Sequence, residues 1–295
     1  MNIIVPATSA NLGPGFDVLG LSLKLYNKVE ITRQKITSIS IKGEGCNNIY
    51  LKKNNTFVKI FNEIYLELTG KTDNFKFNFL NNIPLSRGLG SSSSVIIGAI
   101  ASAYEMAGFK VKKETILNKA LTYENHPDNI APAVFGGFTV SIIDDFKVYT
   151  QKAQLSDKIQ AIVVIPNKPM STNKSRAKLP KHYTAKDSVL NVAYSSFLTS
   201  CFIKQDYDNL KITAKDKFHE DIRMKNLPEL FDVKKLAYEN GSLMSTLSGS
   251  GSSFLNIAYK EDSINLQEKL RSKFKDFRVE IIDFDNIGFK ILTKS

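Results

Sequence analysis

A run of glycines and serines between a strand pattern and a helix pattern constrains the fold of this chain most strongly. Residues 84–94 read PLSRGLGSSSS. Before them, Phe75 to Phe79 alternates aromatic and polar residues, which predicts a half-buried strand. After them, residues 92–107 are apolar nearly all round and stop at Gly108, which predicts a buried helix. A strand, a tight loop and a buried helix therefore follow one another.

This loop has the chemistry of an anion site. Gly88 and Gly90 let main-chain amides approach a ligand closely, and the loop leads into the positive end of a helix dipole. Ser91 and Ser92 could instead only cap the helix, but one serine fills that role and four follow the glycines. The loop is not a Walker motif, because no Gly-Lys-Ser/Thr ends it. We expect a phosphate cradle formed by Pro84, Leu85, Ser86, Arg87, Gly88, Leu89, Gly90, Ser91, Ser92, Ser93 and Ser94.

Sheet and helix patterns occur in both halves of the chain, which predicts an α+β protein of two domains. Asn55 to Thr69 has apolar residues at helical spacing and stops at Gly70. A polar stretch near residues 150–157 marks the expected boundary between domains of residues 1–152 and 153–295. Further predicted strands are 3–5, 21–25, 39–41, 137–143, 159–165, 244–247, 254–259 and 278–284, and further predicted helices are 113–125, 187–205, 206–220, 232–241 and 265–274.

Composition excludes several classes of protein. The net charge of +11 comes from lysines scattered in short pairs, so we expect a solvated basic surface and no specific nucleic-acid binding. No apolar stretch approaches the roughly 20 residues that cross a bilayer, and no secretory signal is visible. Cys46 and Cys201 are far apart, which predicts free thiols in a reducing compartment, the cytoplasm. The oligomeric state stays open, with a homodimer as one alternative.

Five further segments place polar side chains beside turns. Residues 5–20 read VPATSANLGPGFDVLG, 124–137 read ENHPDNIAPAVFGG, 171–176 read STNKSR, 219–223 read HEDIR and 247–253 read LSGSGSS. Taken alone, an aspartate after a Gly-Pro-Gly turn is explained by capping of that turn. A lone glutamate or arginine is explained as a solvated surface residue. An arginine can also bind a carboxylate through two parallel hydrogen bonds, which an amino-acid ligand would need.

These segments together resemble the motifs of the GHMP kinases and, among them, of the homoserine kinases. The loop at 84–94 resembles the second GHMP motif, Pro-x3-Gly-Leu-Gly-Ser-Ser, and LSGSGSS resembles the third. PATSANLGPGFD and ENHPDNIAP resemble homoserine-kinase segments, with Asn125 in place of the usual glycine. Ser252 and Ser253 also depart from the Pro-Thr or Pro-Ser of many relatives. The resemblance spans residues 5 to about 255, with the motifs in the expected order.

The resemblance implies two α+β domains, the second ferredoxin-like, with ATP and substrate bound between them. It implies ATP-dependent phosphorylation of the side-chain hydroxyl of L-homoserine, a step toward threonine. Mg²⁺ would be bound by Glu124 and by a loop serine, Ser94 or Ser93, and Glu124, Asn129 and Arg176 would take part in catalysis. The implied substrate-binding residues are Asn11, Asp17, His126, Asn129, Thr172, Arg176, Arg223 and Gly249.

Several alternatives remain at this stage. Another GHMP activity, on mevalonate or shikimate, is argued against by the HPDN segment, by Asp17 and by the two arginines. A nucleic-acid-binding protein is suggested by charge alone, and a catalytically silent ligand-binding relative is the third alternative. Asp128 could act as a base, or the substrate hydroxyl could lose its proton to the phosphate, because the transition state of phosphoryl transfer is loose.

Overall fold

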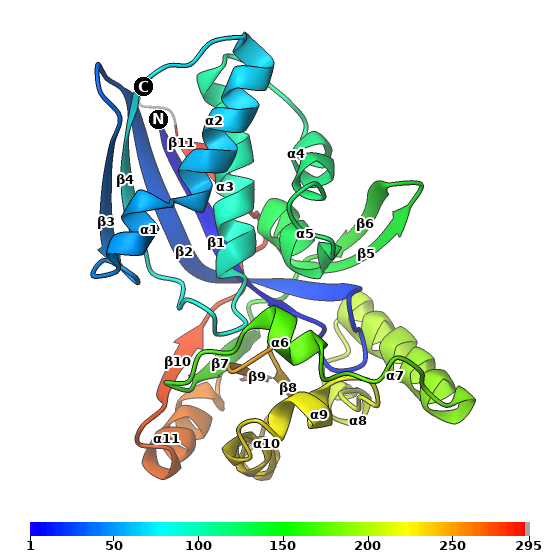
Figure 1. Cartoon of the computed structure of the whole chain (residues 1–295). Coiled ribbons are helices and arrows are strands. Elements are labelled where there is room, and N and C mark those ends of the chain that lie inside the picture. The colour runs from blue at the N-terminus through cyan, green and yellow to red at the C-terminus, as the bar shows by residue number, and fades with distance from the viewer. Residues whose placement is uncertain (293–295) are drawn as a thin grey trace.

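The computed structural model describes residues 1–292 and contains two sheets (Figure 1). The first sheet is mostly antiparallel, and within residues 1–292 only its strands β3 and β4 pair in parallel. Five of its strands are in the order β11 (Lys290–Leu292), β1 (Asn2–Ala10), β2 (Leu19–Arg33), β4 (Phe75–Asn81) and β3 (Ser38–Gly43). In addition, β5 (Phe138–Asp144) pairs with β2 and with β6 (Lys147–Ala153).

The helices of the first half gather around α3 (Ser91–Met106), which Figure 1 shows beside α2 and in front of the sheet. This helix contacts α2 (Thr56–Thr69), α4 (Lys113–Ala120), α5 (Pro127–Phe135) and strand β1. Neighbours on several sides explain why its sequence is apolar nearly all round. A short helix, α1 (Ile49–Lys53), precedes α2.

The second half contains the four-stranded sheet. Its antiparallel strands are in the order β10 (Arg278–Ile282), β7 (Ile159–Ile165), β9 (Phe254–Tyr259) and β8 (Met244–Leu247), which is the 4-1-3-2 order of a ferredoxin-like βαββαβ unit. Between β7 and β8 lie α6 (Thr172–Arg176), α7 (Ala185–Lys204), α8 (Leu210–Thr213), α9 (Glu220–Met224) and α10 (Glu229–Glu239), and α11 (Ser263–Lys273) lies between β9 and β10.

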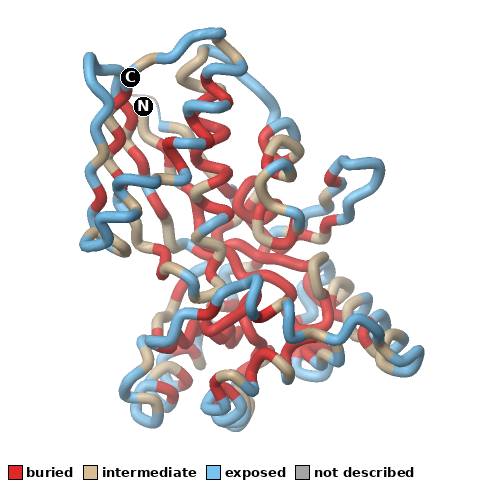
Figure 2. The backbone as a smooth tube through the Cα atoms, viewed as in Figure 1, coloured by how far each residue is buried: buried red, intermediate tan, exposed pale blue. Residues whose placement is uncertain are grey.

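A shared apolar cluster joins the two halves. Leu21 and Phe138 of the first sheet pack in one buried cluster with Val163 of the second sheet and Phe202 of α7. The rings of Phe138 and Phe202 are stacked with centroids 4.4 Å apart. Figure 2 shows buried backbone crossing the middle of the molecule, where the halves meet. The halves are therefore held together by core packing, and residues far apart in sequence meet at one place.

The α+β class is confirmed, and most predicted elements are present. Helix α2 begins after Asn55, whose side chain accepts a hydrogen bond from the Val58 amide, and ends at Gly70 in the left-handed conformation. Strand β7 spans the predicted residues, Ile159–Ile165. The predicted helix 113–125 is shorter, because α4 ends at Ala120.

Other predictions of secondary structure are wrong. The helix predicted over 206–220 is reduced to α8, because Asp216 accepts hydrogen bonds from main-chain amides at the start of α9. No strand was predicted over residues 147–153, where the structure has β6, so the polar stretch at 150–157 begins inside a hairpin strand. The division into domains at residue 152 stays a prediction. No helix within residues 1–292 is both long enough and apolar enough to cross a membrane.

Candidate active site

A cleft of about 590 Å³ brings most of the predicted site residues together. Its lining includes residues 85–93 of the glycine-serine loop, and across from them α6 and Gly249 of the second half. Figure 1 shows α6 below the start of α3. All eight predicted substrate residues and Glu124 line the cleft, whereas Pro84 and Ser94 do not. Apolar lining comes from Ile41, Leu51, Phe57, Phe79 and Val95.

The glycine-serine loop leaves helix amides free. Gly90 occupies the N-cap position of α3 in the left-handed conformation, and no side chain within residues 1–292 caps this helix. Ser94 is the first residue whose amide bonds back to the carbonyl of Gly90. The first-turn amides of Ser91 to Ser93 therefore have no intrahelical acceptor, as expected at a helix start. The capping role considered for the serines is not filled, which leaves these donors for an anion.

Close packing explains the two glycines. A Cβ atom on Gly88 would lie 2.1 Å from the carbonyl oxygen of Ser248, and one on Gly90 would lie 1.9 Å from Oγ1 of Thr8. Both residues also have positive φ. The Ser248 hydroxyl lies 2.7 Å from the Gly88 carbonyl oxygen and 2.8 Å from Oγ of Ser9. This serine therefore connects the first, second and third motifs.

The structure separates the two serines considered for Mg²⁺. Ser94 is buried, donates to the carbonyl of Ser91 and accepts from Nδ2 of Asn27, both at 2.9 Å. Its hydroxyl is thus directed away from the cleft. Ser93 lines the cleft, so it is the serine placed to reach a ligand.

Asp17 and Arg176 form a two-pronged ion pair in the cleft. Their N–O distances are 2.6 and 3.0 Å, and His126 Nδ1 lies 3.4 Å from the same carboxylate. Asn11 accepts from the Asp17 amide and donates to the Gly249 carbonyl, both at 3.0 Å. Both ends of the Asn11 amide are therefore engaged within the protein, and this residue holds Asp17 in place.

Arg223 is a buried cation that lines the cleft. Only 2% of the residue is exposed, and burial, reinforced by the nearby Arg176, lowers its pKa to about 10. Its Nη1 donates to the Gly249 carbonyl at 3.1 Å, while its Nε is buried without a hydrogen-bond partner. Within residues 1–292 it forms no ion pair with a carboxylate. A buried unpaired charge is costly, so this arrangement fits an anionic ligand.

Two carboxylates face the cleft from the segment that precedes and begins α5. Burial raises the pKa of Glu124, and the nearby His126 opposes that shift. Asp128 lies in the first turn of α5 and is only 5% exposed. Burial, with the negative charges of Asp17 and Glu124, raises the pKa of Asp128 to about 7. Such a group can hold or release a proton near neutral pH.

The amide of Asn129 has a fixed orientation. Its Oδ1 accepts a 2.8 Å hydrogen bond from the hydroxyl of Thr8, a fully buried residue on β1. Its amide nitrogen is therefore the end available to a ligand. Thr172, at the start of α6, lies with its hydroxyl 3.2 Å from that of Ser250, so it contacts the third motif.

Sequence reasoning missed three residues that hold the site, Thr8, Phe16 and His219. Phe16 lies under both guanidinium groups, with their central carbons 5.0 Å (Arg176) and 5.3 Å (Arg223) from the ring centroid. All three lie inside segments that the sequence already singled out. Their contacts are to distant residues, however, and residue type alone does not reveal such contacts.

Comparisons with known proteins match both halves of the chain to one kinase family. Residues 55–137 match the family model "GHMP kinases N terminal domain", and residues 198–276 match "GHMP kinases C terminal". Homoserine kinase from Campylobacter concisus is 64% identical over 291 residues, covering 99% of each chain, and that from Campylobacter fetus is 63% identical, covering 98% of this chain and 99% of its own.

A solved structure shows the same fold. The crystal structure of homoserine kinase from Cytophaga hutchinsonii superposes with a TM-score of 0.88 at 24% identity, covering 99% of this chain and 97% of its own. At that identity, the likeness establishes the fold, while the Campylobacter relatives establish the family. The chain belongs to the homoserine kinase family of the GHMP kinases.

Proposed function

We propose that this protein transfers the terminal phosphoryl group of ATP to the side-chain hydroxyl of L-homoserine. One observation carries the proposal: a carboxylate, Asp17, and a buried arginine without an anionic partner, Arg223, line the same cleft as a helix N-terminus with free amides. A zwitterion and a polyphosphate are the ligands that these groups complement. The relatives' name, homoserine kinase, supports the same substrate.

The proposed substrate lies across the charged groups. Its ammonium group binds Asp17, and its carboxylate binds Arg223 together with Arg176. In this structure Arg176 forms hydrogen bonds to the carboxylate of Asp17. The hydroxyl lies near the free amide end of Asn129. His126, beside Asp17, completes the ammonium end. The reaction would then depend chiefly on positioning and charge stabilisation, as is general for phosphoryl transfer.

ATP would rest on the loop at residues 85–93, with its base against the apolar lining of the cleft. Mg²⁺ fits Glu124 and Ser93, because both are oxygen donors that line this cleft. No cluster of three His, Cys, Asp or Glu residues able to hold a metal occurs among residues 1–292, so the other ligands would be phosphate oxygens and water. When bound, the ion would neutralise charge on the transferring phosphate. A homodimer and a cytoplasmic location stay predictions from the sequence.

A substrate panel tests this function. The protein is incubated with ATP, Mg²⁺ and L-homoserine, mevalonate or shikimate, and product is followed by ³¹P NMR. We expect phosphorylation of L-homoserine alone. Turnover of mevalonate or shikimate without turnover of homoserine would reject the proposal, as would binding of homoserine without turnover. A nucleic-acid-binding protein would instead show steeply salt-dependent affinity for DNA or RNA.

Glu124→Gln is expected to lower kcat by at least about tenfold and to raise the Mg²⁺ concentration that gives half-maximal activity, because it removes an anionic oxygen ligand. The measurement is a Mg²⁺ titration of initial rates at saturating ATP and homoserine. Glu268→Gln, at an exposed position on α11, is the matched control. Equal Mg²⁺ curves for the two variants would remove Glu124 from the metal site.

Asp128→Asn is expected to stabilise the fold at neutral and alkaline pH. The folded pKa of Asp128, about 7, lies above the unfolded value of about 3.9. Its contribution to stability is therefore fully present below about pH 3.9 and is lost as pH rises toward 7. The difference between the variant and the wild type in free energy of unfolding should grow over that range to on the order of 2–4 kcal/mol, then level off. Urea denaturation between pH 4 and 9 measures it, and a constant difference would contradict the assigned burial.

Asp128→Asn also identifies the group that accepts the proton of the substrate hydroxyl. A fall in kcat of about 100-fold or more with unchanged KM for homoserine assigns the proton to Asp128, because general bases contribute about 10²–10⁴-fold. A fall below about tenfold assigns the proton to the phosphate itself, in line with a loose transition state. Single-turnover rates separate this chemical step from product release.

A further inference from the structure

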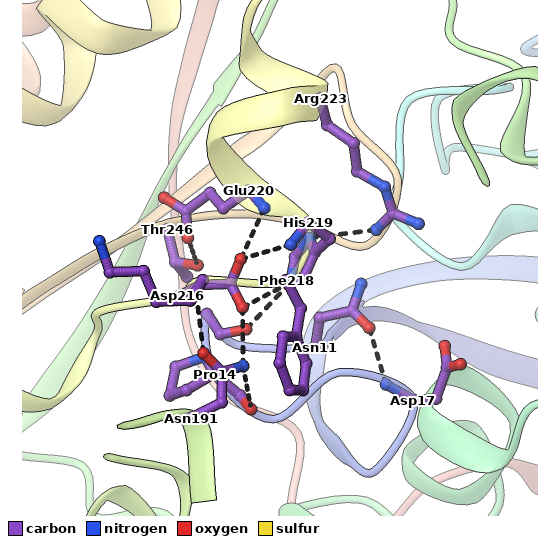
Figure 3. A network of polar contacts seen from close by, with 12 residues as sticks. Asn11, Pro14, Asp17, Asn191, Asp216, Phe218, His219, Glu220, Arg223 and Thr246 are labelled. Carbon is purple, nitrogen blue, oxygen red and sulfur yellow. Dashed lines mark hydrogen bonds and ion pairs between the residues drawn. The ribbon is translucent and has the colours of Figure 1, made fainter. Parts of the chain in front are cut away.

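We propose that His219 is the positioning residue that ties the ammonium end and the carboxylate end of the substrate site to one imidazole ring. The inference rests on the proposed function and extends it to a residue that does not line the cleft. His219 precedes α9, the helix that carries Arg223, and it reaches back to the turn that carries Asp17 (Figure 3).

The two ring nitrogens of His219 have different partners. Nε2 lies 2.9 Å from the main-chain oxygen of Gly13, and Nδ1 lies 3.2 Å from Nη1 of Arg223. A carbonyl oxygen only accepts and a guanidinium nitrogen only donates, so Nε2 must carry the hydrogen and Nδ1 must accept. Figure 3 shows the bond from the ring to Arg223 and the loop carrying Asn11 and Asp17 nearby. One ring therefore holds both the start of the Asp17 turn and the arginine.

This tautomer belongs to a neutral imidazole ring, and the surroundings of His219 favour the neutral form. His219 is 1% exposed, and burial lowers its pKa to about 4, with Arg223 acting in the same direction and Asp216 opposing. At neutral pH the ring therefore has one donor and one acceptor. A second ring hydrogen on Nδ1 would point at the Arg223 donor and break that contact.

A buried network fixes the position of the ring. The Asp216 carboxylate accepts from the main-chain amides of His219 at 2.6 Å and Glu220 at 2.7 Å, and from Nδ2 of Asn191 at 3.0 Å. The same Asn191 nitrogen lies 3.4 Å from the main-chain oxygen of Pro14, next to Gly13. Figure 3 shows these contacts meeting at the Asp216 carboxylate. The turn and the start of α9 are thus held by the same polar groups.

A stacking contact between Phe16 and His219 is a third interaction that links the Asp17 turn to the start of α9. Phe16, one residue before Asp17, stacks on His219 with ring centroids 5.0 Å apart, and the guanidiniums of Arg176 and Arg223 lie over the same phenylalanine. Two like-charged guanidiniums repel each other, so contact with the same aromatic ring helps to fix their separation. A displaced imidazole would therefore disturb both ends of the zwitterion site at once.

The test uses two fragments of homoserine as competitive inhibitors of the full-length protein. 4-Hydroxybutyrate retains the carboxylate and lacks the ammonium group, whereas 3-aminopropan-1-ol retains the ammonium group and lacks the carboxylate. His219→Phe retains a ring that can stack on Phe16 but loses both hydrogen bonds. We expect KM for homoserine to rise at least about tenfold and the Ki of both fragments to rise at least about threefold, with KM for ATP within about twofold.

Comparison variants separate this outcome from simpler ones. Arg223→Met should raise Ki for 4-hydroxybutyrate only, because it removes one end of the site. His182→Phe, at an exposed histidine outside the cleft lining, should behave as wild type. His219→Gln retains one hydrogen-bond donor and one acceptor, so its KM for homoserine and its Ki for both fragments should rise less than those of His219→Phe. If the phenylalanine variant does not fold, the glutamine variant is used for the test.

Three results would overturn the inference. A His219→Phe protein that weakens only 4-hydroxybutyrate would reduce His219 to a support for Arg223. Unchanged affinity for both fragments would remove it from the site, and an equal rise in KM for ATP would indicate a general loss of structure. A wild-type protein that does not phosphorylate homoserine rejects the proposed function instead, so the two failures are distinguishable.

Discussion

Gly88→Ala is expected to lower kcat/KM for ATP by at least about 100-fold. The new Cβ would lie 2.1 Å from the Ser248 carbonyl oxygen and 2.9 Å from that of Gly251. Both atoms belong to the main chain, so no side-chain rotation relieves the contacts, and the loop must move by a substantial fraction of an ångström. Displacement of a positioning element by about 1 Å can cost about 100-fold in rate. Initial rates over a range of ATP concentrations at saturating homoserine measure the effect.

Gly70→Ala is a closely matched control for this prediction. Gly70 also has a positive φ, +68° against +76° for Gly88, but a Cβ atom there would meet nothing within 4 Å. Both variants therefore carry similar backbone strain, about 1–2 kcal/mol in free energy of unfolding. Only Gly88→Ala also forces the loop that carries Gly88 away from the main chain of Ser248 and Gly251. Equal kinetics for the two variants would show that the close approach of the loops does not support nucleotide binding.

Arg223→Met is expected to raise KM for L-homoserine by about 10- to 100-fold while leaving KM for ATP within about twofold. A hydrogen bond to a charged group contributes about 1.5–3 kcal/mol, and Arg223 is the buried cation without a carboxylate partner in the described chain. Methionine fills much of the same volume without a charge. Circular dichroism checks the fold, and steady-state kinetics with each substrate varied measures the split.

A graded variant and a surface control define this result. Arg223→Lys retains the charge but presents a single compact ammonium, so it should fall between wild type and Arg223→Met. Arg278→Met removes an exposed arginine paired with Glu280 and should leave both KM values unchanged. If Arg223→Met retained the wild-type KM for homoserine, the substrate carboxylate would have to bind elsewhere, and the proposed orientation would be wrong.

Local patterns predicted the elements whose boundaries are set by local chemistry. Helix α2 has its Gly70 end written in the sequence, and α3 has apolar residues on nearly every side. Strand β6 escaped prediction because Val148 is its one buried residue, so its sequence shows no clear alternation of apolar and polar residues. The helix predicted over 206–220 was too long. Asp216 accepts hydrogen bonds from main-chain amides there and turns the chain, and hydrophobic periodicity does not reveal such bonds.

The candidate site could be predicted as a set of residues but not as a set of contacts. Motif resemblance located Asp17, Arg176 and Arg223, which do line one cleft. The resemblance could not distinguish Ser93 from Ser94, because one residue of helix rotation decides which of the two lines the cleft. It also could not show that both ends of the Asn11 amide are already engaged. The contact of Asn11 with Gly249 joins residues 238 positions apart, which no local pattern reveals.

The return of the last strand to the first sheet has a consequence for synthesis of the chain. β11 pairs with β1 through Asn2 and Leu292, Ile3 and Ile291, and Ile4 and Lys290. While the ribosome is still adding the second half, this side of β1 has no neighbour, and an open strand edge invites pairing with other chains. A nascent polypeptide in which residues 290–292 have not yet been synthesised therefore exposes an edge of β1 that β11 later covers, and we expect it to be more prone to aggregation.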